Sequence, residues 1–113
     1  MSEDYRKEIV QHIVKNLLEI QLLRIVQFSP TWGYQIKKRF ETDFDVKLRH
    51  GDLYSSLNAL KARGFLECKT IRESGRPRKV YAITETGQTY LQTYNKVLRA
   101  QIKDHKPVKQ SKL

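Results

Sequence analysis

A single stretch, residues 50–87, constrains the fold of this chain more than any other. Its first part predicts a helix, since three leucines fall at the i, i+4, i+7 spacing of one buried helix face and Gly64 is well placed to end it. The leucines are Leu53, Leu57 and Leu60. The next part predicts a β-hairpin. Its pieces are a strand over 65–72, a turn at 74–77 and a returning strand over 80–83. A helix, a hairpin and a further helix in this order predict a winged helix.

The helix face opposite the leucines consists of small or polar residues, which would let a DNA duplex approach closely. They are Ser55, Asn58, Ala59 and Ala62. An asparagine can pair bidentately with an adenine edge in the major groove, and a serine can donate to a base or a phosphate. An ordinary solvated surface is the alternative interpretation of this face.

The predicted hairpin tip is basic. Arg76-Pro77-Arg78-Lys79 places three cations beside a proline that stiffens the backbone. Such a segment suits the phosphate backbone of a duplex or a narrow minor groove. Charge runs also occur on surfaces that only keep a protein soluble. The basic segment and the small-residue helix face together, in this order, favour DNA binding.

The whole chain is strongly basic, with 22 Lys and Arg against 12 Asp and Glu among 113 residues and a formal net charge of +10. This excess fits a nucleic acid or an anionic membrane surface. No apolar run approaches the roughly 18 residues of a membrane span, and the charged N-terminus lacks an apolar signal region. We therefore expect a cytoplasmic protein without a membrane partner. The lone Cys68 excludes an intramolecular disulfide and is expected to be a small buried side chain.

An apolar stripe near the N-terminus is wider than one small domain needs. It consists of Ile9, Val10, Ile13, Val14, Leu17, Leu18, Leu22, Leu23, Ile25 and Val26. It predicts a helix over 5–28 that packs on its own core on one side and on a partner on the other. The segment 29–33 contains a proline and a glycine and is expected to break this helix.

A second helix is predicted over 34–44, with Lys37 on its outer face. Its inner face is Ile36, Phe40 and Phe44. A short strand over 46–48 is expected to lead into the central helix, where Lys47 and Arg49 could clamp a phosphate. Two helices at this separation are typical of a helix-turn-helix, whose second helix enters the major groove.

A long final helix is predicted over 84–105, with Thr84 as its N-cap. Four residues at spacings of three, four and four form a seam typical of two packed helices. They are Leu91, Tyr94, Leu98 and Ile102. One domain cannot easily cover this seam, so a homodimer is expected; the alternative is that the helix folds back on its own core. Residues 106–113 are too polar to pack and predict a disordered basic tail.

These features resemble the PadR family of winged-helix transcriptional regulators. The resemblance spans about residues 13–98. It rests on four motifs in a consistent order: Gly33-Tyr34-Gln35-Ile36, Gly51-Asp52-Leu53-Tyr54, Gly64-Phe65-Leu66 and the block 76–87. It implies a cytoplasmic dimer that binds operator DNA, usually as a repressor, with the first and last helices in the dimer contact. The single helix after the wing resembles the family's compact branch. Some members bind aromatic or drug-like compounds, so the resemblance also suggests a small-molecule effector.

Several positions depart from the family pattern. The family usually has a small hydroxyl residue where Asp52 stands and a proline at Ser55, and it often has arginines at Asn58 and Ala59. Without arginines on the recognition helix, more of the affinity for DNA would come from the wing, from Lys47 and Arg49, and from the tail. Asp52 would repel phosphates unless it caps the helix N-terminus, as its position allows.

Two aromatic residues leave alternatives open. Trp32 stands where the family often has histidine, and it could stack on a ligand or pack partly buried beside the helix junction. Tyr54 could donate its hydroxyl to a phosphate or pack against the core.

The sequence contains no recognisable catalytic or metal-binding constellation. Cys68 lies on a predicted strand with no histidine that spacing places nearby. The histidines, which fall on three different elements, are His12, His50 and His105. Glycines occur singly, so no phosphate-cradling loop is present. We therefore expect no enzymatic activity, no metal and no cofactor.

The sequence thus predicts a mainly α protein with a small β-hairpin. Its parts are a winged helix-turn-helix domain over 1–83, a dimerisation helix over 84–105 and the tail. We expect a dimeric regulator, a repressor, with its recognition helix in the major groove and its wing on the backbone or in the minor groove. The alternatives are a protein-interaction module and a nucleoid-type protein that coats DNA with little sequence preference.

The predicted DNA-binding residues are Lys37, Lys47, Arg49, His50, Tyr54, Ser55, Asn58, Lys61, Arg76, Arg78 and Lys79. The predicted dimer residues are Ile9, Ile13, Leu17, Leu91, Tyr94, Leu98 and Ile102.

Overall fold

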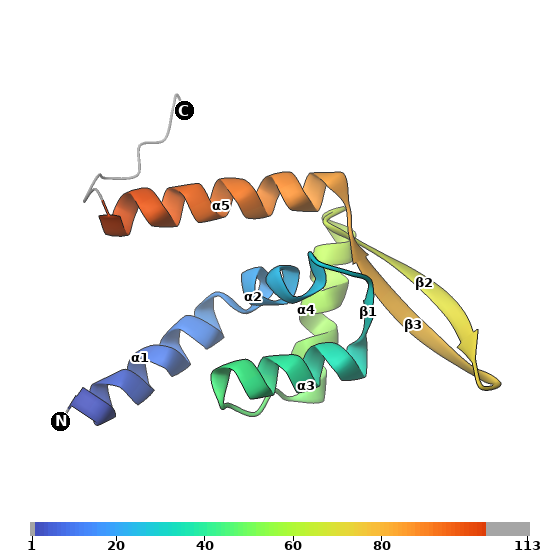
Figure 1. The fold of residues 1–113 in the computed structure, drawn as a ribbon, viewed down its shortest axis with the longest axis horizontal. Coiled ribbons are helices and arrows are strands. Elements are labelled where there is room, and N and C mark those ends of the chain that lie inside the picture. The colour runs from blue at the N-terminus through green and yellow to red at the C-terminus, as the bar shows by residue number, and fades with distance from the viewer. Residues whose placement is uncertain (1, 104–113) are drawn as a thin grey trace.

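The computed structural model describes residues 2–103, and over this range it is mainly helical with one small antiparallel sheet, as predicted (Figure 1). The elements are α1 (Ser2–Asn16), α2 (Leu18–Val26), β1 (Thr31–Trp32), α3 (Gly33–Phe44), α4 (His50–Ala62), β2 (Leu66–Glu73), β3 (Arg76–Ile83) and α5 (Glu85–Lys103). The predicted tail, residues 106–113, lies outside the described residues.

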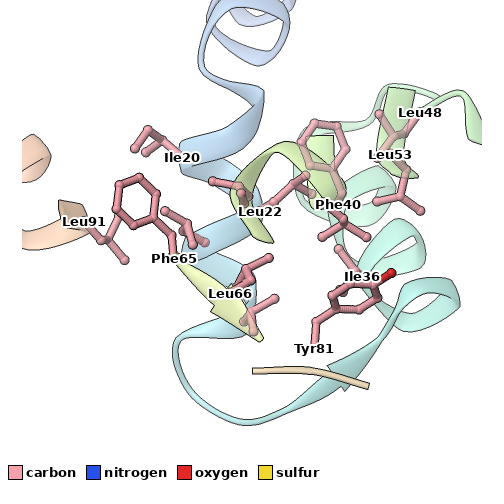
Figure 2. Packing of buried hydrophobic residues seen from close by; sticks show 14 residues of the cluster. Ile20, Leu22, Ile36, Phe40, Leu48, Leu53, Phe65, Leu66, Tyr81 and Leu91 are labelled. Carbon is pink, nitrogen blue, oxygen red and sulfur yellow. The ribbon is translucent and has the colours of Figure 1, made fainter. Parts of the chain in front are cut away.

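One hydrophobic cluster joins α2, α3, α4, the base of the sheet and α5 (Figure 2). Its buried members are Ile20, Leu22, Leu23, Val26, Ile36, Phe40, Leu48, Leu53, Leu57, Leu60, Phe65, Leu66, Tyr81 and Leu91. The three leucines of the central helix are all among them, so the predicted inner face of that helix is confirmed. Because the leucines hold one side of α4 in the core, its other side is left to solvent.

The predicted N-terminal helix is in fact two helices, so the prediction of one helix over 5–28 is wrong. Leu17 leaves the helical conformation at φ −116° and ψ 27°, between α1 and α2. Beyond this break α2 turns into the core and buries Leu22 and Leu23, whereas α1 projects from the body and leaves Ile9 and Ile13 exposed. The two halves of the apolar stripe therefore face different surroundings.

The sheet has the strand order β1-β3-β2, and both pairings are antiparallel. β1 is a third strand that the sequence does not predict, since the proline and glycine of residues 29–33 indicate only a break between helices. The expected strand over 46–48 is wrong, because these residues form a loop. The turn is Ser74-Gly75 alone, with φ of 54° and 78°. The segment Arg76-Pro77-Arg78-Lys79 consequently lies within β3 and not at the tip.

α4 ends at Gly64 as predicted, in a Schellman motif. The Gly64 N–H donates to the Lys61 carbonyl at 3.0 Å, and the Phe65 N–H donates to the Leu60 carbonyl at 2.9 Å. Gly64 has φ of +81°, a left-handed conformation that favours glycine. This turn sends the chain directly from α4 into β2.

Replacing Gly64 by alanine is expected to lower the free energy of unfolding by about 1 to 2 kcal/mol, because a Cβ is unfavourable in left-handed backbone. Urea unfolding followed by circular dichroism measures this. Gly51→Ala is the matched control, since nothing lies within 4 Å of a Cβ there and alanine is favoured over glycine in a helix. Equal losses for the two variants would contradict the role of the positive φ.

Thr84 caps α5, as predicted, and also ties it to the end of α4. Its Oγ1 accepts a hydrogen bond from the Gly87 N–H at 3.0 Å and donates one to the Gly64 carbonyl at 2.6 Å. Its own N–H donates to the Phe65 carbonyl at 3.1 Å. One residue thus fixes the direction of the last helix relative to the central one.

Candidate nucleic-acid interface

The outer face of α4 carries the predicted base-reading residues in exposed positions. Those exposed to solvent are His50, Ser55, Asn58, Lys61 and Ala62, while Ala59 is half-buried. The side chains are short apart from those of His50 and Lys61, so a duplex could come close to the helix backbone. This face can supply an amide and a hydroxyl to base edges.

The loop before α4 presents two cations outward. The Leu48 N–H donates to Glu41 Oε2 at 2.7 Å, and the Leu48 side chain is buried in the core. Lys47 and Arg49, on either side of this anchor, are exposed. They lie just before the N-terminus of α4, where the helix dipole also favours an anion. The position is suited to a DNA phosphate.

Asp52 does not cap α4, contrary to the possibility raised by its position. The N-cap residue is Arg49, and no side chain makes a capping hydrogen bond there. Asp52 lies exposed in the first helical turn, where its charge is favourable to the helix dipole.

Tyr54 packs inside the helix-turn-helix and is not free on the surface. It is half-buried against the core, and its ring lies 4.5 Å from that of His50, centroid to centroid. A Cβ on Gly33 would collide with the Tyr54 hydroxyl, so glycine is needed at the start of α3 for this side chain to fit. Of the two alternatives for Tyr54, the packed position is the one observed.

The N-terminal part of α3 offers further exposed groups that the sequence analysis did not select. Lys37, which was selected, is half-buried, whereas Lys38 and Tyr34 are exposed. The Lys38 ammonium lies 5.9 Å from the Tyr34 ring centroid. Helical periodicity distinguishes inner from outer positions but does not decide which outer cation is most accessible.

The two-stranded ribbon formed by the outer parts of β2 and β3 projects from the body as the wing (Figure 1). Four of its cations are exposed: Lys69, Arg72, Arg76 and Lys79. Lys69 and Arg72 are not among the predicted DNA-binding residues, because a strand pattern does not show which of its side chains lie on an exposed ribbon. The ion pairs found within residues 2–103 join Arg39 to Asp43 and Arg63 to Glu19, and neither involves a cation of the wing, α4 or the α3–α4 loop.

Arg78, the remaining wing cation, is half-buried on the face of Trp32. Its guanidinium carbon lies 3.4 Å from the Trp32 ring centroid. Its Nε is buried and has no hydrogen-bond partner within the described part of the chain. Trp32 is itself half-buried, in agreement with the packing alternative for this residue.

The predicted dimer residues occupy three kinds of position. Ile9, Ile13 and Ile102 are exposed by 54%, 43% and 74%, whereas Leu17, Tyr94 and Leu98 are half-buried. Leu91 is only 2% exposed and belongs to the core of its own chain. The prediction for Leu91 is therefore corrected: α5 rests on α2 at this point and folds back on its own core there.

A cavity of about 570 Å³ lies between α1, α2, α4 and the α3–α4 loop. Val14, Leu18 and Val46 give it an apolar wall, and Lys47 and Asp52 bring charges to it. It is the part of the candidate interface where a small molecule would touch both α1 and the start of α4.

The metal-ligating and titratable side chains outside this interface are predicted to form no site. No group of three or more His, Cys, Asp or Glu side chains within residues 2–103 could hold a metal ion. Cys68 is half-buried opposite Tyr81 in the sheet. Burial, with smaller effects of Cys68 and Tyr54, raises the pKa of Tyr81 to about 12. No helix in the described range is long and apolar enough to cross a membrane.

Comparison with known proteins places the chain among winged-helix regulators. The model of the transcriptional regulator PadR-like family matches residues 22–93. No curated protein sequence matches the chain. Among solved structures, a PadR family transcriptional regulator from Eggerthella lenta has a TM-score of 0.75 at 20% identity and covers 92% of this chain and 91% of its own. A PadR-like regulator from Bacillus cereus has a TM-score of 0.72 at 21% identity, covering 83% and 91%.

A further neighbour is Bacillus subtilis PadR in complex with operator DNA. Its TM-score is 0.64 at 22% identity, and the match covers 86% of this chain and 54% of that one. The fold of the described residues is therefore shared with a protein whose structure holds DNA.

Proposed function

The chain belongs to the PadR-like family of transcriptional regulators, and from this premise we propose that it is a cytoplasmic repressor that binds operator DNA as a homodimer. α4 lies in the major groove, with Asn58 and Ser55 toward base edges. The wing lies on the phosphate backbone or in the adjacent minor groove. Lys47 and Arg49 hold a phosphate at the start of α4.

One observation supports this function above the others: exposed cations that take part in no ion pair within residues 2–103 flank the exposed face of α4. Lys47 and Arg49 precede the helix, and the exposed wing cations follow it. Cations in ion pairs would have to leave their partners before they met a phosphate, whereas these are free to release counterions from DNA. The operator complex of the Bacillus subtilis neighbour supports duplex DNA as the partner.

The proposed dimer uses α1 and α5. Both helices extend from the body on the side away from the wing, and both carry exposed apolar side chains (Figure 1). The exposed isoleucines are Ile9 and Ile13 on α1 and Ile102 on α5. Packing them against a second chain removes their apolar surface from water, which is favourable. This arrangement supports a DNA-binding part over 1–83, of which α1 also contributes to the dimer, and a dimerisation part that begins at residue 84 and contains α5. A two-fold dimer requires a roughly palindromic operator with half-sites about one helical turn apart.

The test of the proposed function is a fluorescence-anisotropy titration against the DNA upstream of the protein's own gene and against a shuffled duplex, at several salt concentrations. Upstream DNA bound at least about a hundredfold tighter, with a steep salt dependence, supports a site-specific regulator. Equal binding of both duplexes would favour a protein that coats DNA. No binding at moderate salt would favour a protein-interaction module.

Replacing Arg76 and Lys79 together by alanine is expected to weaken binding to all duplexes alike and to flatten the log–log salt slope by about 3 to 4 for a dimer, because each phosphate contact contributes about 0.9. The charge-matched control is Arg39→Ala with Lys96→Ala. Arg39 pairs with Asp43 on α3 and Lys96 lies on α5. An unchanged slope in the wing variant would contradict the wing contact.

Asn58→Ala is expected to reduce preference among sequences more than overall affinity. A bidentate amide–adenine pair contributes about 1 to 3 kcal/mol of discrimination at each half-site, so the preferred duplex loses affinity while the shuffled one changes little. Gln92→Ala removes an exposed amide from α5 and is the control. Competition titrations with single-base variants of the preferred duplex measure the effect. Equal losses on every duplex would remove Asn58 from base reading.

A further inference from the structure

The outer part of the wing has no third strand beside it, because β1 is short. β1 pairs only Thr31 with Tyr81 and Trp32 with Val80. Beyond these pairs, β2 and β3 continue to the turn as a two-stranded ribbon, which projects freely in Figure 1. A two-stranded ribbon has little stability of its own in water, so its direction depends on the contacts at its base.

Trp32 reaches from the end of β1 toward the projecting part of this ribbon. Arg78 lies two residues beyond Val80 toward the tip, on the same face of the sheet, where diagonal neighbours are within reach of long side chains. The 3.4 Å stack of Arg78 on the Trp32 ring is therefore a contact between the body and the free part of the wing. Ile71, opposite Arg78 across the ribbon, lies on that face too.

The geometry of the stack leaves Arg78 able to bind an anion. A guanidinium on an aromatic ring uses its flat face, so the terminal N–H groups of Arg78 at Nη1 and Nη2 stay available for hydrogen bonds, whereas its Nε is buried. None of the ion pairs found within residues 2–103 includes Arg78. The buried Nε has no hydrogen-bond partner within the described residues, which is unfavourable, and the contact with an anion therefore falls to the terminal nitrogens.

We propose that Trp32 is a positioning residue for DNA binding. Its indole holds the Arg78 guanidinium flat and fixes the direction of the wing, so that the edge of the guanidinium meets a DNA phosphate or the minor groove without a further loss of side-chain freedom. Trp32 itself acts through Arg78. This proposal rests on the proposed function and extends it to a residue that carries no charge.

The test is a double-mutant cycle of Trp32→Ala and Arg78→Ala, with affinity for the upstream duplex measured at several salt concentrations. We expect each single variant to lower affinity about tenfold and the double variant to be no weaker than Arg78→Ala alone. The salt slope should flatten in Trp32→Ala as in Arg78→Ala, although no charge is removed. Trp32→Phe should restore most of the affinity. Lys47→Ala, in the α3–α4 loop outside the wing, is the control, and its effect should multiply with that of Trp32→Ala.

Circular dichroism and thermal unfolding establish that each variant is folded, and Trp32→Leu, which keeps apolar bulk but has no aromatic face, replaces Trp32→Ala in the cycle if the alanine variant is not. Trp32 is the only tryptophan, so acrylamide quenching in the free protein reports on the stack, and Arg78→Ala should increase it. Multiplying effects of Trp32→Ala and Arg78→Ala, or an unchanged salt slope in Trp32→Ala, would overturn the proposal even where the wild type binds DNA. A wild type without DNA binding would overturn both this proposal and the proposed function.

Discussion

Ile13→Glu is expected to convert the protein to monomers and to lower its affinity for a two-half-site operator by roughly 10² to 10⁴-fold, because the second half-site is then no longer held at high effective concentration. Ile13 is 43% exposed on α1, a helix that contributes little to the core. A charge at this position would be buried without a partner in the dimer but hydrated in the monomer. The substitution should therefore disturb association and leave the fold of the single chain intact.

Sedimentation equilibrium measures the mass, and anisotropy measures affinity for duplexes with one and with two half-sites. The one-half-site duplex should be bound almost as well by the variant as by the wild type. Leu98→Glu tests the other helix of the proposed interface. Lys96→Gln, which lowers the formal charge of α5 by the same one unit, is the control and should stay dimeric. A dimeric Ile13→Glu protein would mean that the chains associate through another surface.

Gly87→Ala is expected to lower the free energy of unfolding by about 2 to 3 kcal/mol, the cost typical of a side chain forced into a packed interior. An added Cβ would collide with the Phe65 carbonyl and would lie 2.9 Å from Ile83 Cγ1. The backbone carbonyl cannot move away without displacing the start of β2 from the first turn of α5. The stability that alanine usually adds when it replaces glycine in a helix is therefore outweighed.

Urea unfolding at a fixed protein concentration measures this loss. Gly51→Ala again supplies the comparison, since it makes the same change in a helix where no atom lies in the way. DNA affinity should also fall at temperatures where Gly87→Ala is folded, because Gly87 lies where α5 meets the winged helix. A Gly87→Ala protein as stable as the wild type would show that α5 can shift freely at this junction.

Regular periodicity and end signals made α4 and the start of α5 predictable. The leucines of α4 repeat at the helical spacing, Gly64 supplies the left-handed stop, and Thr84 supplies the cap. These signals are local, because a helix needs only one apolar face and suitable residues at its two ends. The PadR-like family was indicated separately, by the resemblance of four motifs to that family, and the family model confirms it.

Short elements and breaks were not predictable in the same way. β1 has two residues and no alternation to detect, and it exists only because β3 offers it an edge. The break at Leu17 interrupts a continuous apolar stripe at a residue with no breaking tendency of its own. It occurs where the chain leaves the projecting α1 and enters the core. A one-dimensional pattern does not record that change of direction.

Local sequence patterns were enough to show which helices have an apolar face, where α4 ends and α5 begins, and that the chain carries a large excess of positive charge. Packing selects which members of each set are used. Leu91 enters its own core while Ile13 and Ile102 stay exposed, and Arg78 lies on Trp32 while Arg76 and Lys79 are exposed and in no ion pair of the described residues. The reason is that spacing along a chain fixes which side chains share a face. What each face meets depends on contacts between residues far apart in sequence.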